Sequence, residues 1–105
     1  MIIDATVGRQ LMQDLGEGNF LLLDIRHPYE YETGHIPGAV LLDNDDILAG
    51  KGEEILPKEK DFPIIIYCRS GVRTKSSAKN LVERGYTKVY DMGGILDWPF
   101  RVVQQ

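Results

Sequence analysis

A single cysteine, Cys68, lies where a run of apolar residues gives way to a short turn-rich segment. The residues that follow the cysteine are Arg69, Ser70, Gly71, Val72, Arg73 and Thr74. A thiolate is a strong nucleophile, and neighbouring arginines or the N-terminus of a helix favour the thiolate over the thiol. The types and spacing of these residues therefore predict that Cys68 is a nucleophile in a loop that binds an anion.

The loop can also contribute backbone groups to an anion site. Its N–H groups can curl around a negative centre, and Gly71 permits the tight curvature. Residues 68–79 hold four cations although the chain carries a formal net charge of -4: Arg69, Arg73, Lys75 and Lys79. Lys75 and Lys79 alone would fit a solvated helix face, and a lone cysteine is often simply buried. The two arginines beside Cys68 favour the reactive interpretation, with the six residues after it as the substrate-binding loop.

The elements around this loop indicate an α/β fold. Residues 63–67 are a continuous apolar run typical of a buried strand, and residues 74–84 have the pattern of a helix. Cys68 would then lie at the carboxyl end of a strand, where ligands of open α/β sheets bind. We further expect strands at 20–25, 39–42 and 88–91, an edge contribution from Ile2 and Ile3, a helix that Thr6 caps and that runs to about Leu15, and a turn-rich stretch at 27–38. Strands that alternate with helices predict a mostly parallel sheet covered on both faces.

Length and composition are typical of a single-domain protein. The 105 residues are enough for one hydrophobic core, so we expect one domain over residues 1–105. No apolar run reaches membrane-spanning length and the first residues lack a leader pattern, which predicts a cytoplasmic protein without a membrane partner. One cysteine cannot form an internal disulfide and fits a reducing compartment. The acidic net charge argues against nucleic acid as the main partner.

The ionisable residues outside the loop show no metal or cofactor motif. Two histidines and one cysteine have no zinc-ligand spacing. Asp43, Asp45 and Glu54 occupy three positions of a calcium-binding loop. However, Ile47 and Leu48 stand where such a loop needs a ligand and a glycine. The sequence therefore predicts no metal, no cofactor and a solvated acidic loop in this segment.

Three separated motifs give the chain a resemblance to a known family. CRSGVRT at 68–74 resembles the active-site loop of the rhodanese sulfurtransferases, DIRHPYEYETGHIPGAV at 24–40 is similar to their amino-terminal signature, and GGILDW at 93–98 resembles their closing motif. The resemblance implies a single-domain rhodanese with a three-layer fold, in which helices cover both faces of a central, mostly parallel five-stranded sheet. It also implies thiosulfate sulfurtransferase activity. Cys68 would take a sulfane sulfur from thiosulfate or a similar donor as a persulfide and pass it to cyanide or a thiol acceptor.

The resemblance also implies roles for charged residues. Arg69 and Arg73 would attract the anionic donor, while amides of the loop hold the negative charge of the persulfide. Asp24 and Arg26 would lie near the loop. There they could support its shape through an ion pair or contact the substrate, and both roles stay open.

A second class of enzyme is compatible with a nucleophilic cysteine before a helix. Cysteine phosphatases and arsenate reductases usually place one more residue between nucleophile and arginine than the four between Cys68 and Arg73. A phosphatase also needs a general acid, and no aspartate has a spacing that indicates one. His27 and His35 could act as a base near the thiolate, although a persulfide-forming thiolate stabilised by amides does not require one. This class is therefore the less favoured enzyme.

Two further functions would use the same residues differently. A sulfur-relay carrier would keep the persulfide but exchange sulfur with a protein donor or acceptor, for example a thiol protein such as thioredoxin. A regulatory binding module would need no chemistry, and the presence of Cys68 with both loop arginines counts against it. The motifs leave the physiological donor, the acceptor and the oligomeric state open.

Overall fold

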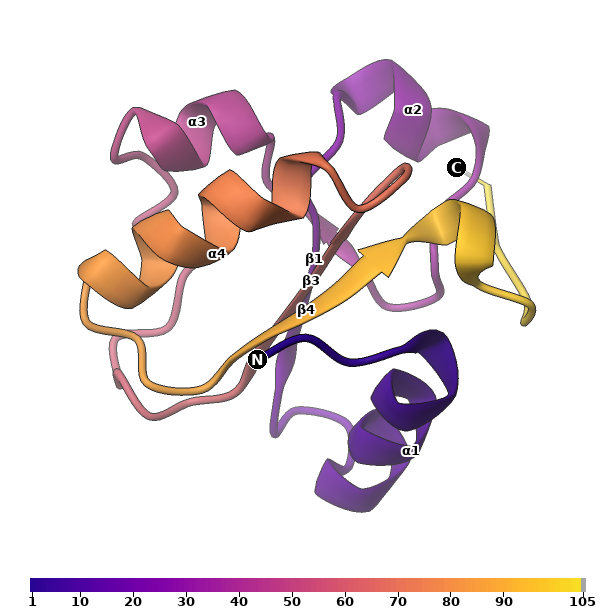
Figure 1. Cartoon of the computed structure of the whole chain (residues 1–105), viewed down its shortest axis with the longest axis horizontal. Coiled ribbons are helices and arrows are strands. Elements are labelled where there is room, and N and C mark those ends of the chain that lie inside the picture. Colours follow the sequence, from indigo (N-terminus) through magenta and orange to yellow (C-terminus); the bar gives the residue numbers. More distant parts are fainter. Residues whose placement is uncertain (105) are drawn as a thin grey trace.

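Helices and strands alternate along residues 1–104, the part of the chain that the computed structural model describes. In chain order they are α1 (Ala5–Leu15), β1 (Leu21–Asp24), α2 (Pro28–Thr33), β2 (Val40–Leu41), α3 (Asn44–Leu48), β3 (Ile64–Cys68), α4 (Arg73–Glu83), β4 (Val89–Gly94) and the 3-10 helix η1 (Ile95–Asp97). The strands form one parallel sheet in the order β2-β1-β3-β4 (Figure 1). This arrangement confirms the predicted α/β class. None of the helices in this range is long and apolar enough to cross a membrane.

The central strand β3 is buried along its whole length. Its side chains alternate between the two faces of the sheet, so both faces need cover. Ile64 and Ile66 belong to one core together with Leu81 of α4. Tyr67 belongs to a second core, against which Leu11 of α1 packs. Figure 1 shows the resulting three layers, with α3 and α4 on one side of the sheet and α1 on the other.

The sheet has four strands within residues 1–104, so the expectation of a fifth strand is wrong. Ile2 makes only an isolated parallel bridge to Asp91 of β4. The chain then turns into α1 because the side chain of Asp4 accepts a hydrogen bond from the N–H of Val7 at 2.8 Å. Asp4 is therefore the cap of this helix, in place of the predicted Thr6, and the segment before it is too short to form a strand.

Two short helices lie in segments for which the sequence predicts a turn-rich stretch and an acidic loop. α2 begins directly after His27, with Pro28 at its first position and Glu30 accepting a hydrogen bond from the N–H of His27 at 3.0 Å. α3 begins after Asp43, whose side chain accepts a hydrogen bond from the N–H of Asp45 at 2.8 Å. Proline in the first turn and acidic side chains at the N-terminus both stabilise the start of a helix. Each helix follows the end of a parallel strand, so both lie at the same edge of the sheet as the loop after β3.

Candidate active site

The loop between β3 and α4, which we call the cradle, curls back over the sulfur of Cys68. The N–H of Gly71 donates a hydrogen bond to Sγ at 3.0 Å, and Gly71 has a φ of 90°, a value that favours glycine. Thr74, in the first turn of α4, donates from Oγ1 to the carbonyl oxygen of Gly71 at 3.0 Å. Cys68 is only 1% exposed, so its sulfur lies at the floor of the cradle, close to the N-terminus of α4. The amide contact and the helix N-terminus both favour negative charge at this position.

The end of β4 forms one wall of the cradle, at a place where only glycine fits. A Cβ on Gly94 would lie 2.2 Å from the carbonyl oxygen of Arg69 and 2.6 Å from the Cα of Ser70. The pairing of β3 with β4 is irregular at this point, and Cys68 is paired with Gly94. The carbonyl oxygen of Arg69 also accepts a hydrogen bond from the N–H of Leu96 at 3.2 Å. The GGILDW motif therefore positions the first half of the cradle, a role that depends on a contact between distant segments.

Lys75 links α4 to the same strand. Its Nζ lies 2.6 Å from Oδ2 of Asp91, and Oδ1 of Asp91 accepts a hydrogen bond from the N–H of Gly93 at 2.9 Å. The side chain of Asp91 is only 3% exposed, whereas that of Lys75 is 57% exposed. Lys75 is thus paired with a buried carboxylate and does more than solvate a helix face.

Arg73, at the start of α4, is held by Glu30 of α2. Its guanidinium donates from Nη1 to Oε1 at 2.9 Å and from Nη2 to Oε2 at 3.0 Å. These hydrogen bonds lower the pKa of Glu30 to about 2. They also raise the pKa of Arg73, to which the nearby Cys68 contributes in the same direction. Arg73 therefore lies close to the sulfur with its charge partly balanced by Glu30, while Arg69 is exposed.

Glu30 is a site residue that the sequence reasoning missed. A local signal was present, because Pro28 and Glu30 stand where a helix start prefers proline and glutamate. That signal would have found α2, and with it a carboxylate at the edge where the parallel strands end. Its pairing with Arg73 is a contact between residues 43 positions apart, which no local pattern specifies.

Asp24 and Arg26 form a buried ion pair together with Tyr67. Nη2 of Arg26 is 2.6 Å from Oδ2 of Asp24 and donates to the carbonyl oxygen of Gly34 at 2.7 Å. The hydroxyl of Tyr67 donates to the same Oδ2 at 2.7 Å, and burial beside this carboxylate raises the pKa of Tyr67. Asp24 is fully buried, and Tyr67 belongs to the opposite core from Cys68. This geometry favours support of the strand ends over contact with the substrate.

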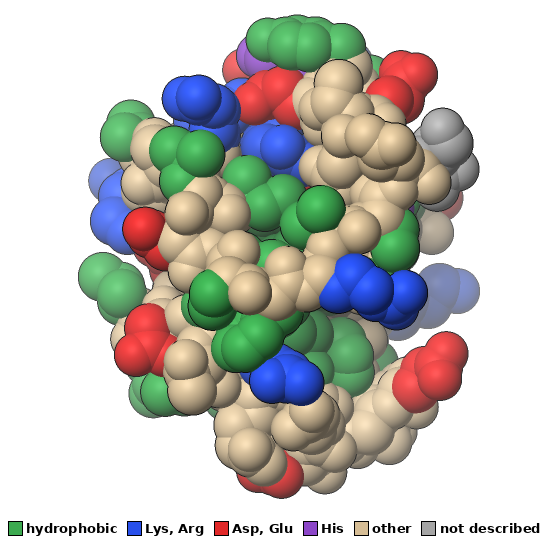
Figure 2. Space-filling model, turned by 90° about the vertical axis from the view of Figure 1, so that its right-hand side faces the viewer, with side chains coloured by type: hydrophobic (Ala, Val, Ile, Leu, Met, Phe, Trp, Pro, Cys, Tyr) green, Lys and Arg blue, Asp and Glu red, His purple; other side chains and the backbone are tan. Residues whose placement is uncertain are grey.

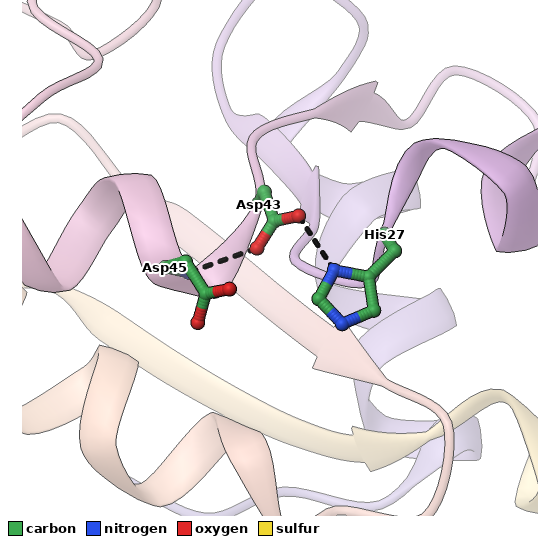
Figure 3. A group of neighbouring side chains, drawn as sticks. All are labelled: His27, Asp43 and Asp45. Carbon is green, nitrogen blue, oxygen red and sulfur yellow. Dashed lines mark hydrogen bonds and ion pairs between the residues drawn. The ribbon is translucent and has the colours of Figure 1, made fainter.

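The two histidines have different surroundings. His35 is buried, and its ring stacks on that of Tyr31 with centroids 3.7 Å apart. His27 is partly exposed, and its Nδ1 lies 2.7 Å from Oδ2 of Asp43 (Figure 3). Asp45 completes a group whose possible ligand atoms lie within 4.8 Å of one another. Both oxygens of Asp43 are already engaged, one by His27 and one by the N–H of Asp45, so hydrogen bonding accounts for the group without a cation.

Apolar and basic side chains are exposed at the edge where the strands end. Tyr29 of α2, Val72 of the cradle and Leu96 of η1, which we call the apolar rim, are 67%, 74% and 61% exposed. Figure 2 views the molecule from the side of α2 and η1, and there hydrophobic side chains lie in and around a hollow with Lys and Arg side chains nearby. An incoming molecule would therefore meet both apolar surface and positive charge.

Comparison with known proteins identifies the chain by both sequence and fold. The sequence model of the rhodanese-like domain matches residues 8–99. A protein of Pseudoalteromonas translucida (strain TAC 125) named thiosulfate sulfurtransferase GlpE is 39% identical over 90 residues, which cover 85% of this chain and 82% of that protein. A tRNA uridine(34) hydroxylase of Photorhabdus laumondii is 30% identical over 99 residues, which cover 91% of this chain but only 28% of that protein.

The solved structures agree with the sequence comparisons. A structure described as a rhodanese with anions from E. coli superposes with a TM-score of 0.70 at 25% identity, and the match covers 81% of this chain and 98% of that chain. The fold is thus that of the rhodaneses, as the sequence motifs implied. Since the family model also spans most of the sequence, and a protein named as a thiosulfate sulfurtransferase is among the relatives, the chain belongs to the rhodanese-like domain family.

Proposed function

We propose that this protein is a sulfurtransferase that moves a sulfane sulfur from thiosulfate, or a similar anionic donor, to cyanide or a thiol through a persulfide on Cys68. The observation that carries the proposal is the position of the sulfur, which accepts the N–H of Gly71 at 3.0 Å in front of the N-terminus of α4. A relative that is matched over 82% of its own length is named a thiosulfate sulfurtransferase, and this name supports thiosulfate as the donor.

In the first step, the Cys68 thiolate attacks the outer sulfur of thiosulfate. A bond forms between Sγ and this sulfur, and the bond to the sulfite group breaks with its electron pair on sulfite. The exposed Arg69 attracts the dianion, and Arg73 adds positive charge beside the cradle. Sulfite leaves as a stable anion, so this step requires no general acid.

In the second step, a nucleophilic acceptor attacks the outer sulfur of the persulfide. The bond between that sulfur and Sγ breaks, and its electron pair returns to Cys68 as a thiolate. The N–H of Gly71 and the N-terminus of α4 stabilise this charge before and after transfer. The protein is then ready for another donor, with no net oxidation or reduction of the chain.

A sulfur relay with a protein partner is the second candidate, and the apolar rim is the observation that favours it. Tyr29, Val72 and Leu96 expose more apolar surface around the cradle than a small anion can use. A thiol protein of the thioredoxin kind would then be the acceptor, and it would take the sulfur from the same Cys68 persulfide. A phosphatase is less favoured because it needs a general acid, and Asp91, on the strand beside the cradle, is already engaged by Lys75 and Gly93.

The proposal is tested by intact-mass measurement of the purified protein before and after thiosulfate, and again after cyanide. We expect a gain of one sulfur atom, its removal by cyanide, and release of thiocyanate in parallel. Cys68 is the only cysteine of the sequence, so Cys68→Ser should abolish the gain. A wild type that never gains sulfur, or a Cys68→Ser protein that gains it equally, would show that the proposal is wrong. A stable persulfide that small acceptors discharge poorly would favour the relay.

A further inference from the structure

His27 lies at the edge of the cradle, one carboxylate away from Arg73. Its backbone N–H donates to Oε1 of Glu30 at 3.0 Å, and Nη1 of Arg73 donates to the same oxygen at 2.9 Å. Arg73 in turn is close enough to Cys68 for the cysteine to help raise the pKa of its guanidinium. The imidazole of His27 is partly exposed, with 41% of its side chain accessible, and it is close enough to Arg73 and Glu30 for both to act on its pKa.

The orientation of this imidazole is set by Asp43. Nδ1 of His27 lies 2.7 Å from Oδ2 of Asp43, and the other oxygen of Asp43 is held by the N–H of Asp45 at 2.8 Å. Figure 3 shows that the second ring nitrogen, Nε2, points away from this carboxylate. When the ring is neutral, an Nδ1–H that donates to Asp43 leaves Nε2 as a proton acceptor. A carboxylate that orients an imidazole and leaves its second nitrogen free is the arrangement of a general base.

We propose that His27, oriented by Asp43, is the general base that takes the proton of an acceptor thiol during sulfur transfer. This inference rests on the proposed function and concerns its second step only. Thiosulfate and other donors without an acidic proton do not need the base, so the loading of Cys68 does not depend on His27.

The proposed step is balanced in atoms and charge. Nε2 of neutral His27 accepts the proton of the acceptor R–SH, and the sulfur of the resulting thiolate attacks the outer sulfur of the Cys68 persulfide. A bond forms between the two, and the bond to Sγ breaks with its electron pair on Cys68. The product is the persulfide of the acceptor, and the proton passes from His27 to solvent.

The groups that face His27 come from three helices. Asp43 and Asp45 belong to the start of α3, Glu30 lies on α2 and Arg73 begins α4; the ring of Tyr29 is stacked at 6.0 Å. The hydrogen bond to Asp43 raises the pKa of His27 above its ordinary value of 6.5, Arg73 acts in the opposite direction, and Glu30 adds to the increase. Below this raised pKa the imidazolium cannot accept a proton, so transfer to thiols should weaken as the pH falls.

The test uses the full chain, loaded with thiosulfate and freed of excess donor, in single-turnover reactions with two kinds of acceptor. One is 2-mercaptoethanol, an alkyl thiol that is mostly protonated at neutral pH. The other is thionitrobenzoate, an aromatic thiol that is already ionised there. His27→Asn should slow transfer to the alkyl thiol by at least about tenfold and change transfer to the aromatic thiolate by less than about twofold, because only the first needs a base. Asparagine is also a good N-cap, so α2 should still form.

Two further variants distinguish a chemical role of His27 from a structural one. Asp45→Asn removes a charge from the same group without touching the ring of His27 and should leave both reactions unchanged. Asp43→Asn, like His27→Asn, should slow sulfur transfer to the alkyl thiol. In Asp43→Asn the pH dependence of this transfer rate should shift to lower pH. If circular dichroism shows that His27→Asn is not folded, His27→Gln takes its place.

Two results would overturn the inference. An equal loss with both acceptors would mean that His27 only maintains the cradle, and no loss with either would mean that it handles no proton. Failure of the wild type to load sulfur is a different outcome, since it contradicts the proposed function itself. Loading is measured by intact mass before each transfer reaction, so the two failures are distinguishable.

Discussion

The ion pair between Glu30 and Arg73 makes the stability of the folded protein depend on pH. The pKa of Glu30, about 2, lies below the ordinary value of 4.5, because Arg73 donates two hydrogen bonds to the ionised carboxylate. The folded protein therefore holds this proton less tightly than the unfolded chain. The resulting stabilisation is fully present above pH 4.5 and is lost as the pH falls towards about 2.

Glu30→Gln should remove this stabilisation. We expect the free energy of unfolding at neutral pH to fall by about 1–3 kcal/mol, since a charge-assisted pair is replaced by a neutral contact. Persulfide loading should also slow, because Arg73 is no longer fixed beside the sulfur. Urea denaturation at neutral pH and at about pH 3 measures the first effect, and the decrease between the two should be smaller in the variant than in the wild type.

Glu32→Gln is the control for this change. Glu32 lies on the same short helix and is exposed, so its loss alters the net charge equally without removing a partner of Arg73. An unchanged acid sensitivity in Glu30→Gln would contradict the assigned role of the ion pair.

At the scale of elements, β4 and the cradle form one unit. Gly94→Ala would place a methyl group 2.2 Å from the carbonyl oxygen of Arg69, and neither backbone can move without disturbing the pairing of β3 with β4. We expect a loss of about 1–3 kcal/mol in stability together with a large loss of sulfur loading, measured by denaturation and intact mass.

The matched control is a glycine far from the cradle. Gly18→Ala meets no neighbouring atom within 4 Å but must adopt a φ of 86°, so it should cost about 1–2 kcal/mol in stability and leave loading intact. Equal loading in Gly94→Ala and the wild type would show that β4 does not position the cradle.

The buried pair of Asp24 and Arg26 also connects elements, because Tyr67 of β3 donates a hydrogen bond to Asp24 at the end of β1. Tyr67→Phe removes the hydroxyl that donates to Asp24 and accepts the N–H of Ile36 at 3.1 Å. Two buried polar groups lose a partner, so the free energy of unfolding should fall by about 1–3 kcal/mol. Loading of the folded protein by thiosulfate should stay the same, because this network lies on the opposite face of the sheet from Cys68. A loading defect larger than the fraction unfolded would instead indicate a direct role in the site.

At the scale of the whole molecule, the parts predicted well from sequence are those specified locally. One stretch of sequence holds the apolar run before Cys68, Gly71 three residues after it, and the helix that follows. Their order predicts a cradle at the end of a parallel strand. The same holds for the alternation of strands and helices, which predicts the α/β class.

The parts that could not be predicted depend on distant contacts or on very short elements. Glu30 meets Arg73, Gly94 meets Arg69 and Asp43 meets His27 only after the sheet has assembled. α2 and α3 have six and five residues, too few for an apolar period, so only their caps could reveal them. Within residues 1–104 the predicted fifth strand is only an isolated bridge, because Asp4 begins a helix where the chain would otherwise continue beside β4.

In the proposed sulfur transfer, the deep position of Cys68 would give the loaded and empty proteins different shapes as seen by a partner. The empty thiol is only 1% exposed, whereas a persulfide adds one atom at about 2 Å from Sγ and can extend only towards the opening of the cradle. A bulky thiol protein can then touch the transferable sulfur but not the sulfur beneath it. Steric reach would thereby allow an acceptor to recognise the loaded form, and it would protect the empty protein from mixed disulfides that block the next cycle.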